Sequence, residues 1–302
     1  PPAMSAATAG YIGRFAPSPT GPLHFGSLLA AIASYAEARR RQGQWLLRIE
    51  DIDPPREQPG ADRRIVEALE RYGFRWDGPV LYQSEARERH EALVAALLES
   101  GAAYPCSCSR KDLAEAPRGP LGVIYPGTCR EGAAGTETAI RVRTDDEPVA
   151  FEDRLQGQFS QRLESESGDY IIRRRDGLIA YQLAVVADDA AQGITEVVRG
   201  IDLLDSTPRQ IHLQRLLGLP TPVYLHIPVA VNASGQKLSK LTGAEGIDLD
   251  RPAPVLLAAL RALRQDPPDA LEGASVADIW SWTLRNWGLD PLIGQESIPI
   301  GQ

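Results

Sequence analysis

The chain has 302 residues, of which 43% are hydrophobic and 24% are charged, and its net charge at pH 7 is −8. This composition is normal for a globular protein with a core, and the acidic balance counts against a broad nucleic-acid surface that neutralises phosphates. Because no apolar run approaches the roughly 20 residues of a membrane helix and no leader pattern is present, we expect a cytoplasmic protein without a membrane partner.

The first hundred residues alternate between strand-like and helix-like patterns. We expect residues 1–9 to be a disordered N-terminus, in which an added segment precedes a natural start at Met4. The patterns predict strands at 11–15, 44–49 and 80–82, and helices at 27–42, 62–72 and 86–100. This βαβα order predicts an α/β protein with a parallel sheet and helices on both faces, and residues 10–102 would form the first half of that Rossmann-like domain.

The pattern changes at residue 103. Cysteines, prolines and glycines cluster between Tyr104 and Gly135, and short β-type runs follow at 139–142 and 149–151. These features predict an insertion over residues 103–170, between the two halves of the sheet domain.

The βα pattern then returns over residues 171–241. Asp176-Gly177, between the runs 170–174 and 179–186, predicts a hairpin turn. Further along, the patterns predict a strand at 194–198, a helix at 207–217 and a strand at 223–231. Helical patterns at 252–265 and 275–287 predict a short helical C-terminal part over residues 242–302.

The loop at residues 17–26 reads Pro-Ser-Pro-Thr-Gly-Pro-Leu-His-Phe-Gly and joins the first strand to the first helix. A strand, a tight loop and a helix N-terminus present backbone N–H groups and a positive dipole end to a phosphate. His24 adds a side-chain donor, and Gly26 allows close approach to the backbone. A loop of this kind by itself is more often an ordinary connection, so other parts of the chain must decide.

Three separate motifs together resemble class I aminoacyl-tRNA synthetases of the glutamyl branch, over residues 11–245. The first is the loop at 17–26, which matches the family's HIGH signature. The second is Leu-Arg-Ile-Glu-Asp-Ile-Asp-Pro at 47–54, and the third is Lys-Leu-Ser-Lys at 237–240, which matches the KMSKS loop. The resemblance implies a ligase that binds ATP on a Rossmann-like catalytic domain.

The resemblance also implies how ATP is bound. In this family the amino-acid carboxylate attacks the α-phosphate, so the protein positions the reactants and stabilises charge without a nucleophile of its own. His24, Gly26 and Ser27 would hold the phosphates, while Lys240 and, less directly, Lys237 would neutralise the leaving pyrophosphate, with Mg²⁺ accompanying ATP. Ser27 replaces the second histidine of the family signature.

A glutamate ligand carries two carboxylates and one ammonium, so its pocket requires arginines and an acid. By resemblance, Glu50 would bind the ammonium, and Tyr181 and Arg199 also match family positions. Arg199 is the better candidate for a bidentate grip on the side-chain carboxylate. The near wall of the pocket would consist of consecutive residues: Arg14, Phe15, Ala16, Pro17 and Ser18. Of these, Arg14 and Ser18 would contact carboxylate oxygens.

The three cysteines form a candidate zinc site with a structural role. They are Cys106, Cys108 and Cys129. An odd number argues against a disulfide framework, and zinc requires a fourth ligand, which no histidine in this segment supplies. Tyr125 matches a tyrosine used by zinc-bearing relatives, and Asp112 and Glu115 are the general alternatives. Without a metal, the three would be buried thiols.

The segment after Leu241 is short compared with the anticodon-reading domain of ordinary glutamyl-tRNA synthetases. Together with the cysteines, it resembles the glutamyl-Q tRNA(Asp) synthetase family. That resemblance implies a monomer that activates L-glutamate without tRNA and transfers it to queuosine at the wobble position of tRNA(Asp). Three alternatives stay open: a short enzyme that charges the 3′ end of tRNA(Glu), a non-catalytic RNA- or nucleotide-binding paralogue, and a general nucleotidyl transferase.

Overall fold

The computed structural model describes residues 10–238 and 245–300. Two sequence-based predictions therefore lie outside the described residues. They are the disordered N-terminus over residues 1–9 and the role of Lys240 in the third motif.

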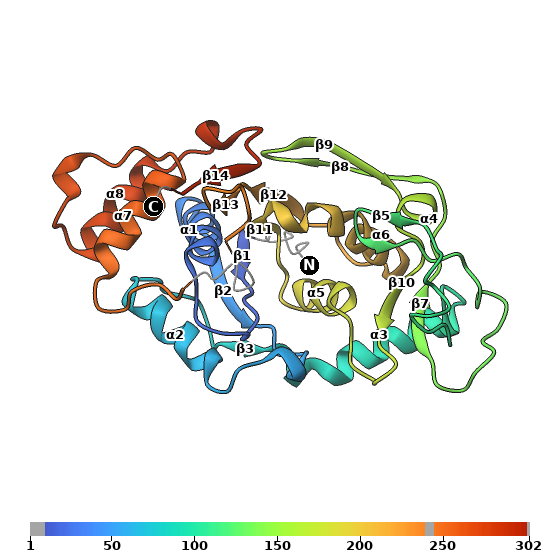
Figure 1. The fold of residues 1–302 in the computed structure, drawn as a ribbon. Helices are drawn as coiled ribbons and strands as arrows, with labels where there is room; N and C mark the ends of the chain where they lie inside the picture. The colour runs from blue at the N-terminus through green and yellow to red at the C-terminus, as the bar shows by residue number, and fades with distance from the viewer. Residues whose placement is uncertain (1–9, 239–244, 301–302) are drawn as a thin grey trace, which may run out of the picture.

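Parallel strands form the centre of the molecule (Figure 1). They are β1 (Ile12–Phe15), β2 (Gln44–Ile49), β3 (Leu81–Tyr82), β11 (Glu196–Gly200) and β12 (Val223–Ile227). β1, β2 and β3 pair in that order, and β11 pairs with β12. The two groups meet where the Thr195 amide donates to the Ile12 carbonyl, with an N···O distance of 2.9 Å. The predicted α/β fold with a parallel sheet is thus confirmed.

Helices flank these strands. They are α1 (Phe25–Arg40), α2 (Ala61–Arg71), α3 (Arg87–Glu99), α4 (Leu163–Glu166), α5 (Tyr181–Ala191), α6 (Thr207–Leu217), α7 (Pro252–Ala262) and α8 (Val276–Asn286). α1 contacts β1, β2 and β11, while α7 and α8 pack against it at one end of the molecule (Figure 1). Because α1 is covered on several sides, it is buried almost throughout residues 28–38. No described helix has the length and apolarity needed to cross a bilayer.

A second group of strands lies at the opposite end of the molecule from α7 and α8 (Figure 1). β4 (Ala103–Cys106), β7 (Ala139–Val142) and β10 (Tyr170–Arg173) form an antiparallel sheet in the order β10-β7-β4. The hairpin of β8 (Pro148–Asp153) and β9 (Gly157–Arg162) joins the parallel strands, because Asp153 pairs with Tyr224 of β12.

The remaining elements are short. The strands are β5 (Arg118–Gly119), β6 (Gly122–Val123), β13 (Val229–Val231) and β14 (Ser297–Pro299). The 3₁₀ turns are η1 (Pro54–Arg56), η2 (Gln83–Ala86), η3 (Ile201–Ser206), η5 (Asp269–Leu271) and η6 (Asp290–Leu292).

Most predicted elements occur within two residues of their predicted bounds. β2, β7 and α6 have the predicted bounds at both ends. The strand predicted at 223–231 divides at Pro228 into β12 and β13, because proline has no N–H group for a continuous ladder.

The hairpin predicted around Asp176-Gly177 is wrong. The turn forms, but only one bridge joins Arg173 to Ile179, and the chain then enters α5. Alanine and leucine in this segment favour a helix. Its apolar side chains, among them Leu183, join a core that α3 and β10 share. Tertiary packing therefore overrides the local turn signal.

Gly43 closes the tight connection between α1 and β2. Its amide donates to the Ala38 carbonyl at 2.9 Å, and a Cβ there would lie 2.5 Å from the Tyr11 carbonyl oxygen. Because backbone atoms cannot give way, we expect Gly43→Ala to lower the free energy of unfolding by about 1–3 kcal/mol, measured by urea denaturation. At Gly288 an added Cβ meets nothing within 4 Å. Gly288→Ala should change stability by less than about 0.5 kcal/mol. Equal effects at the two sites would contradict this account.

Candidate active site

One cavity of about 760 Å³ lies at the carboxyl ends of the parallel strands, which is where open parallel sheets bind ligands. It is lined by every predicted ATP- or glutamate-site residue that the structure describes, including Tyr181 and Arg199. They are Arg14, Phe15, Ala16, Pro17, Ser18, His24, Gly26, Ser27, Glu50, Tyr181, Arg199 and Lys237. The structure thus brings these residues together, while their individual roles stay predictions.

His24 caps the N-terminus of α1. The Ser27 amide donates to His24 Nδ1 at 3.3 Å, and Ser27 Oγ lies 2.9 Å from Nε2. With Nδ1 accepting, the ring proton is on Nε2 and points to the serine. A Cβ on Gly26 would lie 3.1 Å from His24 Cε1 and 3.4 Å from the Leu238 carbonyl oxygen. Ser27 therefore orients His24, and Gly26 allows the first and third motifs to approach closely.

The described residues on both sides of the segment 239–244 lie near this helix N-terminus. Gly246 forms a β-bridge with His24, and the Lys237 ammonium forms an ion pair with Asp202. The first turn of α1 contains no acidic side chain. The positive end of the helix dipole therefore faces the cavity without a neighbouring acid in that turn, as an anion site requires.

A buried ion network supports the near wall of the cavity. Arg14 donates to both carboxylate oxygens of Asp189, at 3.0 and 3.1 Å, and Arg48 Nη2 donates to Asp189 at 2.7 Å and to Glu50 at 3.3 Å. Burial raises the pKa of Asp189, but the two arginines outweigh it and lower that pKa to about 2. Gln83 also donates to Glu50, at 3.1 Å. The charge of Arg14 is therefore already paired within the protein.

Arg199 lies at the end of β11 and is only 5% exposed. Its guanidinium donates to His226 Nε2 at 3.1 Å, to the Tyr181 hydroxyl at 3.3 Å and to Thr207 Oγ1 at 2.9 Å. No carboxylate within residues 10–238 and 245–300 forms an ion pair with it. Unlike Arg14, this buried cation is held by neutral acceptors alone.

His226 is itself fixed by Asp153. Its Nδ1 lies 2.5 Å from Asp153 Oδ2, and its amide donates to the same oxygen at 3.0 Å. Burial lowers the pKa of His226 to about 4, despite the nearby carboxylate. The imidazole is therefore neutral near pH 7, with its proton on Nδ1 and its Nε2 lone pair available to Arg199.

These supporting residues were not predicted from the sequence. His226 occurs within the apolar run Val-Tyr-Leu-His-Ile of β12, where a polar residue must find a partner. Arg48 stands two positions before Glu50 in the second motif, a spacing that places both side chains on one face of a strand. Asp153 and Asp189 carried no local signal, because their partners are remote in sequence.

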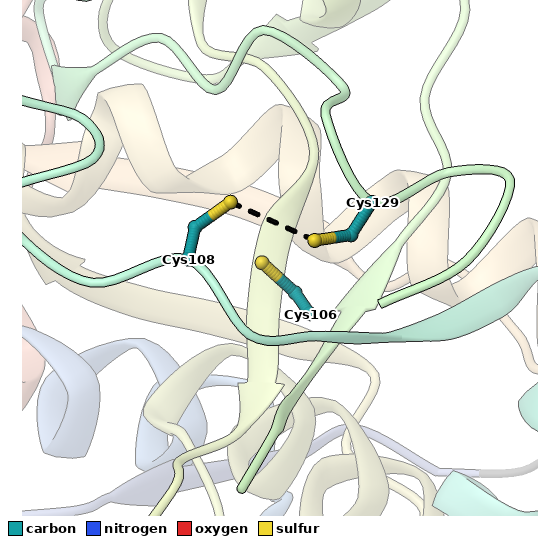
Figure 2. Close-up of side chains that lie close together, drawn as sticks. All are labelled: Cys106, Cys108 and Cys129. Carbon is teal, nitrogen blue, oxygen red and sulfur yellow. Dashed lines mark hydrogen bonds between the residues drawn. The ribbon is translucent and has the colours of Figure 1, made fainter. Parts of the chain in front are cut away.

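The three cysteines converge on one point (Figure 2). Their Sγ atoms all lie within 4.8 Å of one another, and Cys108 and Cys129 are 3.6 Å apart. The Tyr125 hydroxyl lies 3.3 Å from Cys106 Sγ and 3.5 Å from Cys108 Sγ. Zinc–sulfur bonds of about 2.3 Å in a tetrahedron place sulfurs about 3.8 Å apart, so this donor set fits a metal ion. The carboxylates of Asp112 and Glu115 do not belong to the group.

The surroundings of Cys129 favour its thiolate, whereas burial and the neighbouring thiols raise the pKa of Cys108. Arg141 Nε donates to Cys106 Sγ at 3.3 Å, and its guanidinium lies 3.9 Å from the Tyr125 ring centroid. Burial raises the pKa of Cys129, but hydrogen bonds from the Ser107 backbone and the Tyr125 hydroxyl outweigh it and lower that pKa to about 6. Thiolates are the form that binds metal.

Comparison with known proteins identifies the family. Residues 12–246 match the family described as tRNA synthetases class I (E and Q), catalytic domain. A protein of Ectopseudomonas mendocina named glutamyl-Q tRNA(Asp) synthetase is 55% identical, over 92% of this chain and 93% of the relative. A Pseudomonas fluorescens protein of the same name is 52% identical, over 99% of both chains.

Solved structures agree on the fold. The crystal structure of a glutamate tRNA ligase from Elizabethkingia meningosepticum superposes with a TM-score of 0.80 at 24% identity, covering 96% of this chain and 67% of that one. That likeness concerns the fold alone. With 52–55% identity to two proteins of that name and the class I match over residues 12–246, this chain belongs to the glutamyl-Q tRNA(Asp) synthetase family of class I tRNA synthetases.

Proposed function

We propose that this chain activates L-glutamate with ATP, without tRNA, and transfers the glutamate to queuosine at the wobble position of tRNA(Asp). The names of its relatives support the acceptor. The observation that carries the choice of amino acid is Arg199, a buried cation beside the cavity with neutral partners alone among the described residues. The proposed enzyme is a cytoplasmic monomer, and its three free cysteines are consistent with a reducing compartment.

The ATP half of the proposal uses the N-terminus of α1. His24 and the amides around Gly26 and Ser27 would bind phosphate oxygens, and Lys237 with Lys240 would neutralise the pyrophosphate as it leaves. Mg²⁺ that arrives with ATP would reduce the charge of the phosphates. The glutamate α-carboxylate attacks the α-phosphate, and the bond to pyrophosphate breaks. The protein contributes position and electrostatic stabilisation.

The glutamate half uses other residues that line the same cavity. A buried guanidinium without a counter-charge is unfavourable, and a ligand carboxylate supplies that charge. Glutamine has the same shape, but its neutral amide cannot do so. Arg199 would therefore bind the side-chain carboxylate, while Glu50 would bind the ammonium and Arg14 and Ser18 would contact carboxylate oxygens.

The cysteine cluster would hold one structural zinc ion. Cys106, Cys108 and Cys129 would supply thiolates, and the Tyr125 hydroxyl would be the fourth ligand because it is in contact with two of the sulfurs. Bound zinc would tie the end of β4 to the loop at residues 125–129 and add to the folding free energy of this region.

The acceptor is tested directly by determining where labelled glutamate becomes attached to tRNA. The protein is incubated with ATP, labelled glutamate and either queuosine-containing tRNA(Asp) or tRNA(Glu). We expect label on tRNA(Asp) alone, in the anticodon fragment after nuclease digestion, and none on tRNA(Asp) that lacks queuosine. Label on the 3′ end of tRNA(Glu) would contradict the acceptor, and a lack of glutamate-dependent pyrophosphate exchange would contradict the enzyme.

The role of Arg199 is tested by pyrophosphate exchange. Removing a buried charge partner costs at least about 2 kcal/mol, so Arg199→Met should raise KM for glutamate by about thirtyfold or more and leave KM for ATP within about twofold. Arg209 offers a matched control, since it also forms no ion pair in the described chain but packs on Tyr170, outside the cavity. Arg209→Met should leave KM for glutamate unchanged. An unchanged KM in Arg199→Met would refute this role.

The metal is tested by elemental analysis of protein purified without chelator. We expect about one equivalent of zinc, because structural sites bind it tightly. Tyr125→Phe should weaken zinc affinity by about tenfold or more in competition with a chromophoric chelator. Asp112→Asn should not, because that carboxylate accepts from Ser109 instead. A zinc content below about half an equivalent would overturn the site.

A further inference from the structure

The Arg199 guanidinium is held in place by a buried pair that no motif predicted. We infer that Asp153 and His226 are positioning residues for Arg199, and that they set the preference for a carboxylate over an amide in the substrate side chain. This inference rests on the proposed function, since it requires that Arg199 contacts the side chain of the amino acid.

Asp153 is a rigid anchor. Its carboxylate accepts hydrogen bonds from the amides of Leu155, Gln156 and His226, each at 3.0 Å. Both side chains of the pair are fully buried. The His226 ring stacks on Tyr224, with an interplanar angle of 13°, so it has little freedom to rotate. The chain therefore fixes both the place and the plane of the imidazole.

The same contacts fix the histidine tautomer. An ionised carboxylate only accepts, so the proton of the neutral ring resides on Nδ1, 2.5 Å from Asp153 Oδ2. Nε2 then accepts from Arg199 Nε at 3.1 Å. In the other tautomer an N–H on Nε2 would face the N–H of Arg199. Burial keeps the pKa of His226 near 4, so this arrangement persists at neutral pH.

The pair orients Arg199 without neutralising it. His226, Tyr181 and Thr207 contribute a ring nitrogen and two hydroxyls, none of them charged, whereas Arg14 is paired with the carboxylate of Asp189. The negative charge that balances Arg199 must therefore come from the ligand. An amide ligand would leave the guanidinium uncompensated, which is how a site rejects a close analogue.

The experiment compares Asp153→Asn, His226→Gln and His90→Gln with the wild type in pyrophosphate exchange with glutamate and with glutamine. An asparagine at 153 can donate to Nδ1 and move the ring proton to Nε2. We expect KM for glutamate to rise about tenfold in Asp153→Asn, with kcat and KM for ATP within about twofold, because the contact exists in both ground and transition states. The ratio of kcat/KM for glutamate over glutamine should fall by the same factor.

Two variants separate positioning from general stability. His226→Gln keeps an acceptor near the place of Nε2, so its glutamate-over-glutamine ratio should exceed that of Asp153→Asn. His90 is the matched control, since it is buried against Asp188 at 3.0 Å and does not line the main cavity. His90→Gln should lower the thermal midpoint without changing KM for glutamate or the ratio.

Side-chain ¹⁵N NMR gives a readout that does not depend on catalytic activity. We expect the wild-type His226 spectrum to show a neutral ring protonated on Nδ1 between about pH 6 and 8, and Asp153→Asn to show the proton on Nε2. A wild-type proton on Nε2, or a folded Asp153→Asn with the proton moved but KM and ratio unchanged, would overturn the inference. If the wild type lacked glutamate-dependent exchange, the proposed function would fail, and with it the specificity role. The spectrum would still report the tautomer.

Discussion

The rest of the site depends on how the buried guanidinium of Arg199 is held without a negative partner in the described chain. Arg199 is placed by β11, and its three neutral acceptors come from α5, α6 and β12. Each of these elements ends or begins at the edge of the parallel strands. The topology of the sheet thus places a cation at the cavity, and in the proposed function its complement is the anionic side chain of the substrate.

The cavity combines two kinds of positive group. The Arg14 charge is balanced by Asp189 within a buried network. Arg14 therefore contributes hydrogen-bond donors to the cavity but attracts an anionic ligand only weakly. Arg199 and the N-terminus of α1 instead present charge that ligands must complement. Both line the same cavity, as the proposed binding of an anionic side chain and of phosphates requires. One loop, from Arg14 to Ser27, forms part of both regions.

Local patterns in the sequence predicted the elements, and the resemblance to the glutamyl branch of synthetases predicted much of the cavity wall. β2 and α6 have their predicted bounds, and Glu50 and Arg199 line the same cavity as the loop at 17–26. Long-range pairs were beyond such reasoning. Asp153 and His226 are 73 positions apart, and Arg14 and Asp189 are 175 apart. The hairpin at Asp176-Gly177 failed for the same reason, because packing against distant elements decided the conformation.

The central claim is that Arg199 selects a carboxylate side chain by charge. Titration calorimetry with non-reactive glutamyl- and glutaminyl-adenylate analogues measures that selection in the absence of chemistry. The account predicts that the wild type binds the glutamyl analogue about thirtyfold more tightly or better, and that Arg199→Met binds the two with similar affinity. Equal affinity of the wild type for both analogues would contradict it.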